Sequence, residues 1–89
     1  MKNISEYGLP HRVHYHIDGH NGYHGSEHEP HVHIRGGNGC DVKYSIRTGN
    51  YMEGRFGGAS EKEIDRWVNN HLYELMREWE DADDPMGGR

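Results

Sequence analysis

The sequence lacks the features that mark a secreted or membrane-spanning protein. It has a single cysteine, Cys40, so no disulfide can form within the chain. It has no apolar run long enough for a signal peptide or a transmembrane helix. Only 31% of its 89 residues are hydrophobic, so we expect one domain, residues 1–89, with a thin core and a shallow site. We expect a cytoplasmic protein with no membrane contact, a flexible N-terminus over about residues 1–10 and a frayed tail over about 82–89.

The chain also lacks net positive charge, although the acidity is unevenly distributed. Its formal net charge is −5. Residues 1–58 hold six lysines or arginines and six acids, whereas residues 59–89 hold four bases and nine acids. Eight of the nine histidines fall between positions 11 and 33, so protonation makes the first half cationic. Such a bipolar molecule suits contact with nucleic acid at one end and with a basic protein at the other.

Alternating apolar and polar residues predict an antiparallel sheet in the first two thirds of the chain. We expect strands over residues 11–17, 31–35, 41–47 and 51–56, with a long connection over 18–30. The glycine-rich segment 36–39 and the pair Gly49-Asn50 supply turns. The residues expected to point inward are Val13, Tyr15, Ile17, Val32, Ile34, Val42, Tyr44, Ile46, Met52 and Phe56.

The pattern changes to helical spacing after Gly57-Gly58. Ser60 and Glu63 have the spacing of a capping box, and apolar residues then recur every three or four positions, which predicts one amphipathic helix over about 61–82. The expected fold is α+β and two-layered, with an antiparallel sheet of about four strands covered on one face by one long C-terminal helix. The uncovered face would display His14, His16, His31, His33, Arg35, Lys43, Ser45, Arg47, Tyr51 and Arg55.

The segment His28-Glu29-Pro30-His31-Val32-His33 is the strongest candidate for a functional site. Strand alternation puts His31 and His33 on one face, and Pro30 stiffens the residues before them. One interpretation is a site for zinc or another divalent transition metal. Its ligands would come from His14, His16, His28, His31 and His33.

A second interpretation is metal-independent RNA cleavage. One imidazole would take the proton of a 2′-hydroxyl and another would protonate the leaving 5′-oxygen. The imidazoles would be those of His28, His31 and His33, and the cations that hold the phosphate would be Arg35, Lys43 and Arg47. Tyr51 would stack on a base. The acidic total charge opposes this interpretation, and a polar face that binds nothing is the third alternative.

The segments EHEPHVHIRG and WVNNHLYELMREWE resemble the small prokaryotic family called domain of unknown function 4160. The resemblance covers about His11 to Asp81. It places the family's histidine, proline and His-x-His pattern on His28, Pro30, His31 and His33, and its helix pattern on Trp67, Glu74, Leu75 and Trp79.

The family is similar to proteins of toxin–antitoxin cassettes. The resemblance therefore implies a cognate partner protein and an RNA target. The alternative is a non-enzymatic interaction protein, an antitoxin or a mobile-element-encoded inhibitor, that uses the acidic helix and tail. The exposed edges of a small sheet also make a homodimer an expectation. The sequence leaves enzyme and binding protein open.

Overall fold

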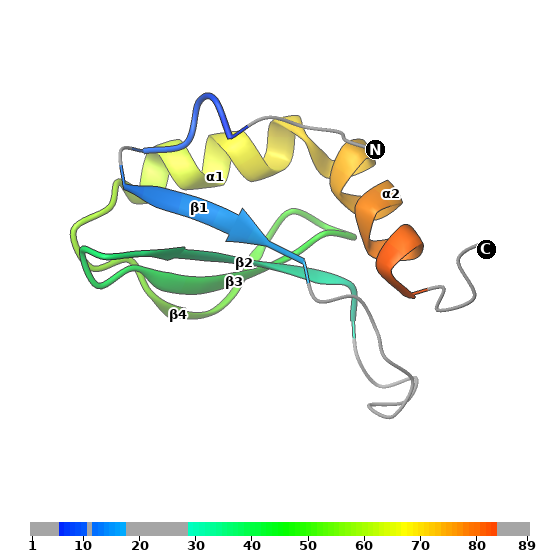
Figure 1. The fold of residues 1–89 in the computed structure, drawn as a ribbon, viewed down its shortest axis with the longest axis horizontal. Coiled ribbons are helices and arrows are strands. Elements are labelled where there is room, and N and C mark those ends of the chain that lie inside the picture. Colours follow the sequence, from blue (N-terminus) through cyan, green and yellow to red (C-terminus); the bar gives the residue numbers. More distant parts are fainter. Residues whose placement is uncertain (1–5, 11, 18–28, 84–89) are drawn as a thin grey trace.

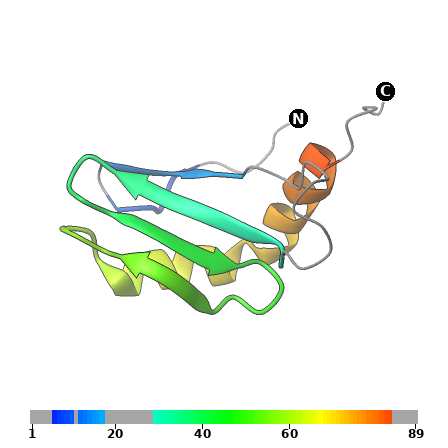
Figure 2. The ribbon, with the colours of Figure 1, turned by 90° about the horizontal axis from the view of Figure 1, so that it is seen from below.

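A computed structural model describes residues 6–10, 12–17 and 29–83, and it has an α+β fold. Its elements are β1 (Val13–His16), β2 (His31–Gly36), β3 (Asp41–Ser45), β4 (Tyr51–Arg55), α1 (Glu61–Asn70) and α2 (Leu72–Asp83). The strands form one antiparallel sheet in the order β1-β2-β3-β4. The helices lie on one side of this sheet, and Figure 2 looks onto the other side, with α1 behind the strands (Figures 1 and 2). The predicted α+β class and four-stranded sheet are confirmed.

The core lies between the sheet and the two helices. The residues of the sheet predicted to point inward include Val32, Ile34, Val42 and Tyr44, each at most 1% exposed. On the helical side, Ile64, Trp67, Val68, Leu75 and Trp79 are buried against them. Full burial of one such aliphatic side chain contributes about 1.5–3 kcal/mol. These contacts leave the opposite face of the sheet for polar residues.

The prediction of one uninterrupted helix is wrong, because the helix breaks at His71. The His71 ring nitrogen Nδ1 lies 2.7 Å from the carbonyl oxygen of Trp67. In a continuous α-helix that carbonyl would accept from the backbone N–H of His71, which instead donates to Val68 at 3.0 Å. Helical bonding resumes when Leu75 N–H donates to the His71 carbonyl. As a result α2 turns away from the direction of α1 toward the end of the sheet (Figure 1).

Two side chains of β4 lie on the face opposite to the one predicted. Lys43 pairs with Glu53 while Tyr44 pairs with Tyr51, so Met52 is an extra residue in a bulge. The bulge shifts the alternation by one residue. It brings the Tyr51 ring to 6.2 Å from the buried Tyr44 ring, on the helical side, and leaves Met52 37% exposed. The prediction that Tyr51 lies on the face without helices, the open face, is therefore wrong, and its stacking on a base stays a prediction.

Side chains satisfy backbone groups on both outer strands. On β1, the backbone N–H of Tyr15 donates to the Glu6 carboxylate at 3.3 Å. On β4, the Tyr51 hydroxyl donates to the carbonyl of Gly54. Such contacts compete with pairing to a second chain at the sheet edges. The homodimer stays a prediction.

Gly54 is expected to be the most sensitive glycine of the sheet. Its φ is +108°, and a Cβ there would collide with the Asp41 carbonyl oxygen and lie 2.7 Å from the Val42 Cα. We expect Gly54→Ala to lower the free energy of unfolding by about 2–4 kcal/mol in urea titrations. Gly37→Ala is the matched control, because nothing lies within 4 Å of its Cβ position. Equal stability of the two variants would contradict the described β4 backbone.

Candidate functional site

The strand register assembles the polar residues of the open face into two rows. We call the first the histidine–lysine row; it comprises His16, His33, Lys43 and Glu53, each paired with the next across the sheet. The second, the arginine row, comprises His14, Arg35, Asp41 and Arg55. Directly paired residues project from the same face with Cβ atoms about 4.5–5.5 Å apart. Both rows lie on the face without helices, the open face, since their neighbours along β1, β2 and β3 point into the core. The β4 members follow from their pairing with Lys43 and Asp41.

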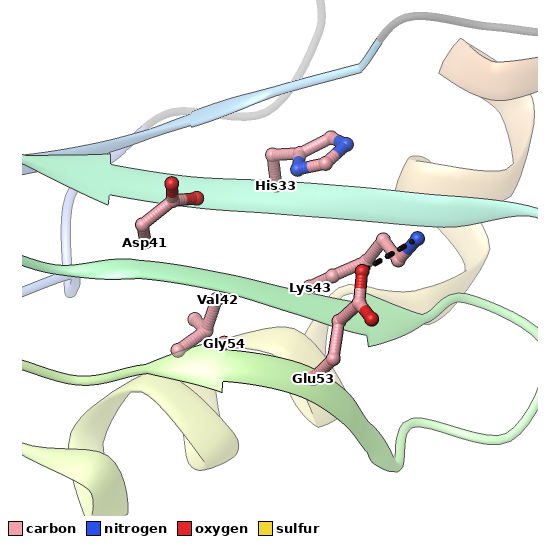
Figure 3. Close-up of a pocket in the computed structure, with 6 residues that line it drawn as sticks. All are labelled: His33, Asp41, Val42, Lys43, Glu53 and Gly54. Atoms are coloured by element: carbon pink, nitrogen blue, oxygen red, sulfur yellow. Dashed lines mark ion pairs between the residues drawn. The ribbon is translucent and has the colours of Figure 1, made fainter.

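A shallow pocket of about 330 Å³ lies over the middle of this face. Its lining residues are His33, Asp41, Val42, Lys43, Glu53 and Gly54 (Figure 3). Within it, Lys43 Nζ is 3.2 Å from Glu53 Oε2. The Lys43 side chain is only 25% exposed, whereas the Glu53 side chain is 68% exposed. The pocket therefore presents a partly buried ammonium group with an imidazole on one side and an accessible carboxylate on the other.

The charge of the open face differs in sign from that of the helical layer. The two rows contain the cations Arg35, Lys43 and Arg55 and the acids Asp41 and Glu53. In contrast, α1 and α2 contain eight acidic and three basic residues. The negative charge of the chain is thus concentrated in the helices, on the side of the sheet opposite to the open face. The acidic net charge of the chain therefore does not describe the charge of this face.

His31 is close to His33, as the sequence predicted, but it is turned toward α2. Its side chain is 8% exposed, and its ring centre lies 5.1 Å from that of Trp79 and 5.1 Å from that of His33. Its Nδ1 is 2.8 Å from the carbonyl oxygen of Glu29. Because a carbonyl only accepts, Nδ1 carries a proton there, and the neutral ring has its lone pair on Nε2. The hydrogen bond to Glu29 fixes the His31 ring, which packs edge to face against the ring of His33.

The residues before β2 are attached to the turn after β3. Ser45 Oγ donates to Glu29 Oε2 at 2.6 Å and accepts from the backbone N–H of Arg47 at 3.2 Å. Ser45 is 2% exposed, so it acts as a buried link instead of facing solvent as predicted. Arg47 lies in the exposed turn between β3 and β4, outside both rows. Of the three predicted phosphate-binding cations, the structure brings Arg35 and Lys43 to the site.

The predicted metal ligands are only partly within the described structure. His14 and His16 are exposed on β1, in different rows. His28 lies outside the described residues. Within residues 6–10, 12–17 and 29–83, no three His, Cys, Asp or Glu side chains are grouped so that they could hold a metal ion. Zinc binding stays a prediction.

Sequence reasoning missed the acidic members of the rows. The sequence pattern predicts no role for Glu53 and places Asp41 only in a strand. Alternation is the signal that could have found Glu53, because Glu53 stands between Tyr51 and Arg55, which are both expected on the uncovered face. Its pairing with Lys43 depends on the register of β3 and β4, which alternation does not show.

Two further polar groups near the sheet have structural roles. Burial and a hydrogen bond to Glu78 raise the pKa of Tyr15 well above its usual value. That hydroxyl donates to the Glu78 carboxylate at 3.0 Å and fastens β1 to α2. Burial, with Asp41 next in the chain, also raises the pKa of the Cys40 thiol, which keeps it protonated and poorly nucleophilic.

Fold and site together define a small α+β domain that exposes a polar, histidine-bearing sheet face. The family model described as "Domain of unknown function (DUF4160)" matches residues 21–80, about two thirds of the chain, and the protein belongs to this family. The match confirms the resemblance inferred from the sequence. No curated protein and no solved structure matches the chain. None of the helices in the described part of the chain has the length and apolar character to cross a bilayer.

Proposed function

We propose that this protein is a metal-independent ribonuclease, the toxin of a toxin–antitoxin pair, that cleaves single-stranded RNA on the open face of its sheet. The observation that supports the proposal is the order of residues in the histidine–lysine row. Lys43 stands between His33 and Glu53, and all three line one pocket (Figure 3). A general acid and a general base on either side of a cation suit the cleavage of a phosphodiester, because the pair transfers the protons and the cation stabilises the developing negative charge.

The row suggests a division of roles between three side chains. The phosphodiester sits over Lys43, whose ammonium group balances the charge that develops on the phosphate oxygens. The Glu53 carboxylate takes the proton of the 2′-hydroxyl, and the resulting oxygen attacks phosphorus. Protonated His33 gives its proton to the departing 5′-oxygen, and a 2′,3′-cyclic phosphate remains. The strands that carry His33 and Glu53 are two strand spacings apart, roughly 9.5 Å, which leaves room for a phosphate between the two side chains.

One part of the proposed chemistry differs from the chemistry that the sequence suggests. The sequence suggests proton transfer by two imidazoles from the His28 to His33 segment. His31 is buried against Trp79, whereas Glu53 is exposed beside the pocket. A carboxylate on β4 is thus better placed than a second imidazole on β2 to act across the phosphate from His33. The toxin–antitoxin resemblance further implies a cognate partner protein.

The test is cleavage of an unstructured RNA oligonucleotide by the full chain in the presence of EDTA. We expect fragments ending in a 2′,3′-cyclic phosphate, and no cleavage at a nucleotide whose 2′-hydroxyl is replaced by hydrogen. Cleavage that stops with EDTA and returns with added zinc would overturn the metal-independent mechanism in favour of a metal centre. Absence of cleavage with and without zinc would overturn the enzyme and leave an interaction protein.

A further inference from the structure

We propose that the arginine row is a second phosphate-binding site, so that the substrate is a single-stranded oligonucleotide that lies along the strands, with one phosphate on each row. The proposal rests on the proposed ribonuclease site, which it extends from one phosphate to two. It adds His14 and Arg55 to the functional surface. Arg35 then binds the second phosphate instead of the phosphate at which cleavage occurs.

The separation of the two rows fits successive phosphates of one strand. On each of the four strands, the two rows are two residues apart, as in His33 and Arg35 or Lys43 and Asp41. Two residues of β-strand span about 6.8 Å. This length is comparable to the step between neighbouring phosphates in an extended single strand. A nucleic acid that follows the strand direction therefore meets a cation at each phosphate.

The charges of the arginine row favour an anion. Asp41 pairs in register with Arg35 on one side and with Arg55 on the other, so two guanidinium groups flank one carboxylate. Arg35 Nε is 3.5 Å from Asp41 Oδ1, and the two side chains are 53% and 61% exposed. The carboxylate can hold the Arg35 side chain in place while its other N–H groups stay accessible. Guanidinium groups bind phosphate in a bidentate manner, which suits a positioning site.

The two rows differ in what they offer chemically. The histidine–lysine row contains an acid–base pair around a partly buried ammonium group, whereas the arginine row contains exposed guanidinium groups. The histidine–lysine row has the groups to cleave the phosphodiester at a bound phosphate, whereas the arginine row has groups that only bind a phosphate. Loss of the second should therefore weaken binding of longer substrates and leave the bond-breaking step intact.

The test measures binding of non-cleavable 2′-O-methyl oligonucleotides to the full chain at several salt concentrations. The probes are a dinucleotide with one internal phosphate and a trinucleotide with two. We expect the trinucleotide to bind more tightly, with a steeper salt dependence. The double variant Arg35→Gln, Arg55→Gln should lower the slope of log K against log salt for the trinucleotide by about 0.7, the value for one phosphate contact on a single strand, and each single variant should lower it by less. Dinucleotide affinity should stay unchanged.

Arg66→Gln is the matched control, because Arg66 is an exposed arginine on α1, in the helical layer. It should leave both affinities and both slopes as in the wild type. Equal binding of the two probes, or variants that weaken both probes alike, would overturn the second site. The probes cannot be cleaved, so binding and cleavage are tested separately. A trinucleotide slope equal to two phosphate contacts, without any RNA cleavage, would support the second site and refute the proposed ribonuclease. RNA cleavage with a trinucleotide slope equal to one phosphate contact would support the ribonuclease and refute the second site.

Discussion

His33→Ala is expected to lower the single-turnover rate of RNA cleavage by about 10²–10⁴-fold, the usual loss when a general acid is removed. His33 lines the pocket beside Lys43, and its backbone partners on β1 and β3 hold it in the middle of the sheet. The side chain is only half-buried, so the variant should fold. Circular dichroism and urea unfolding would check the fold, and saturating RNA would separate the loss of rate from a loss of binding.

His31→Phe distinguishes His33 from its neighbour. Phenylalanine keeps a ring between Trp79 and His33 but has no nitrogen to exchange a proton. Because His31 is 8% exposed and bonded to the Glu29 carbonyl, we expect His31→Phe to retain most of the cleavage rate that His33→Ala loses. If the two variants lost the same activity, the proton transfer assigned to His33 would have to be shared with His31.

Much of the fold follows from hydrophobic spacing. Val32 and Ile34 on β2 and Val42 and Tyr44 on β3 are buried where alternation placed them. The predicted helix start is also confirmed, since Ser60 Oγ accepts from the backbone N–H of Glu63 at 3.3 Å. Both patterns are properties of the chain that do not depend on distant residues, and this is why the sequence alone predicted them.

The helix break depends on a contact that spacing does not encode. An apolar stripe continues through the His71 position, and its periodicity favours one helix. The break arises because the His71 ring, 4.7 Å from the Trp67 ring, binds the Trp67 carbonyl oxygen. That oxygen therefore no longer accepts from the backbone N–H of His71. Side-chain competition of this kind depends on the rotamer that the surrounding packing selects. Its consequence for the site is large, since the altered direction of α2 brings Trp79 to His31.

The sequence predicted which histidines belong to the site but not how the residues of the site are arranged. Alternation correctly put His31 and His33 near one another, but it could not show that α2 covers the first and leaves the second in the pocket. The pairing of Lys43 with Glu53 depends on the register of β3 and β4, which the sequence pattern did not indicate. Register is a long-range property, so a single strand's pattern identifies the face of a residue but not its neighbours across the sheet.

Trp79→Ala is expected to lower the free energy of unfolding by about 3–5 kcal/mol, the usual cost of deleting a large buried ring. Trp79 is 6% exposed and is the residue of α2 whose ring contacts His31. Tyr73→Ala is the control on the same helix, because Tyr73 is 70% exposed, and it should change stability by less than about 0.5 kcal/mol. Urea titration measures both.

A milder substitution separates the effect on the site from the effect on the fold. Trp79→Phe keeps an aromatic ring against His31 and should remain folded, since it leaves a smaller cavity than alanine. If Trp79 positions His33 through His31, Trp79→Phe should lower the cleavage rate at saturating RNA while RNA affinity stays constant. The NMR resonances of the His31 ring and of the His33 ring should both shift in Trp79→Phe. Wild-type stability in Trp79→Ala, or unchanged histidine resonances in Trp79→Phe, would show that α2 does not support the site in this way.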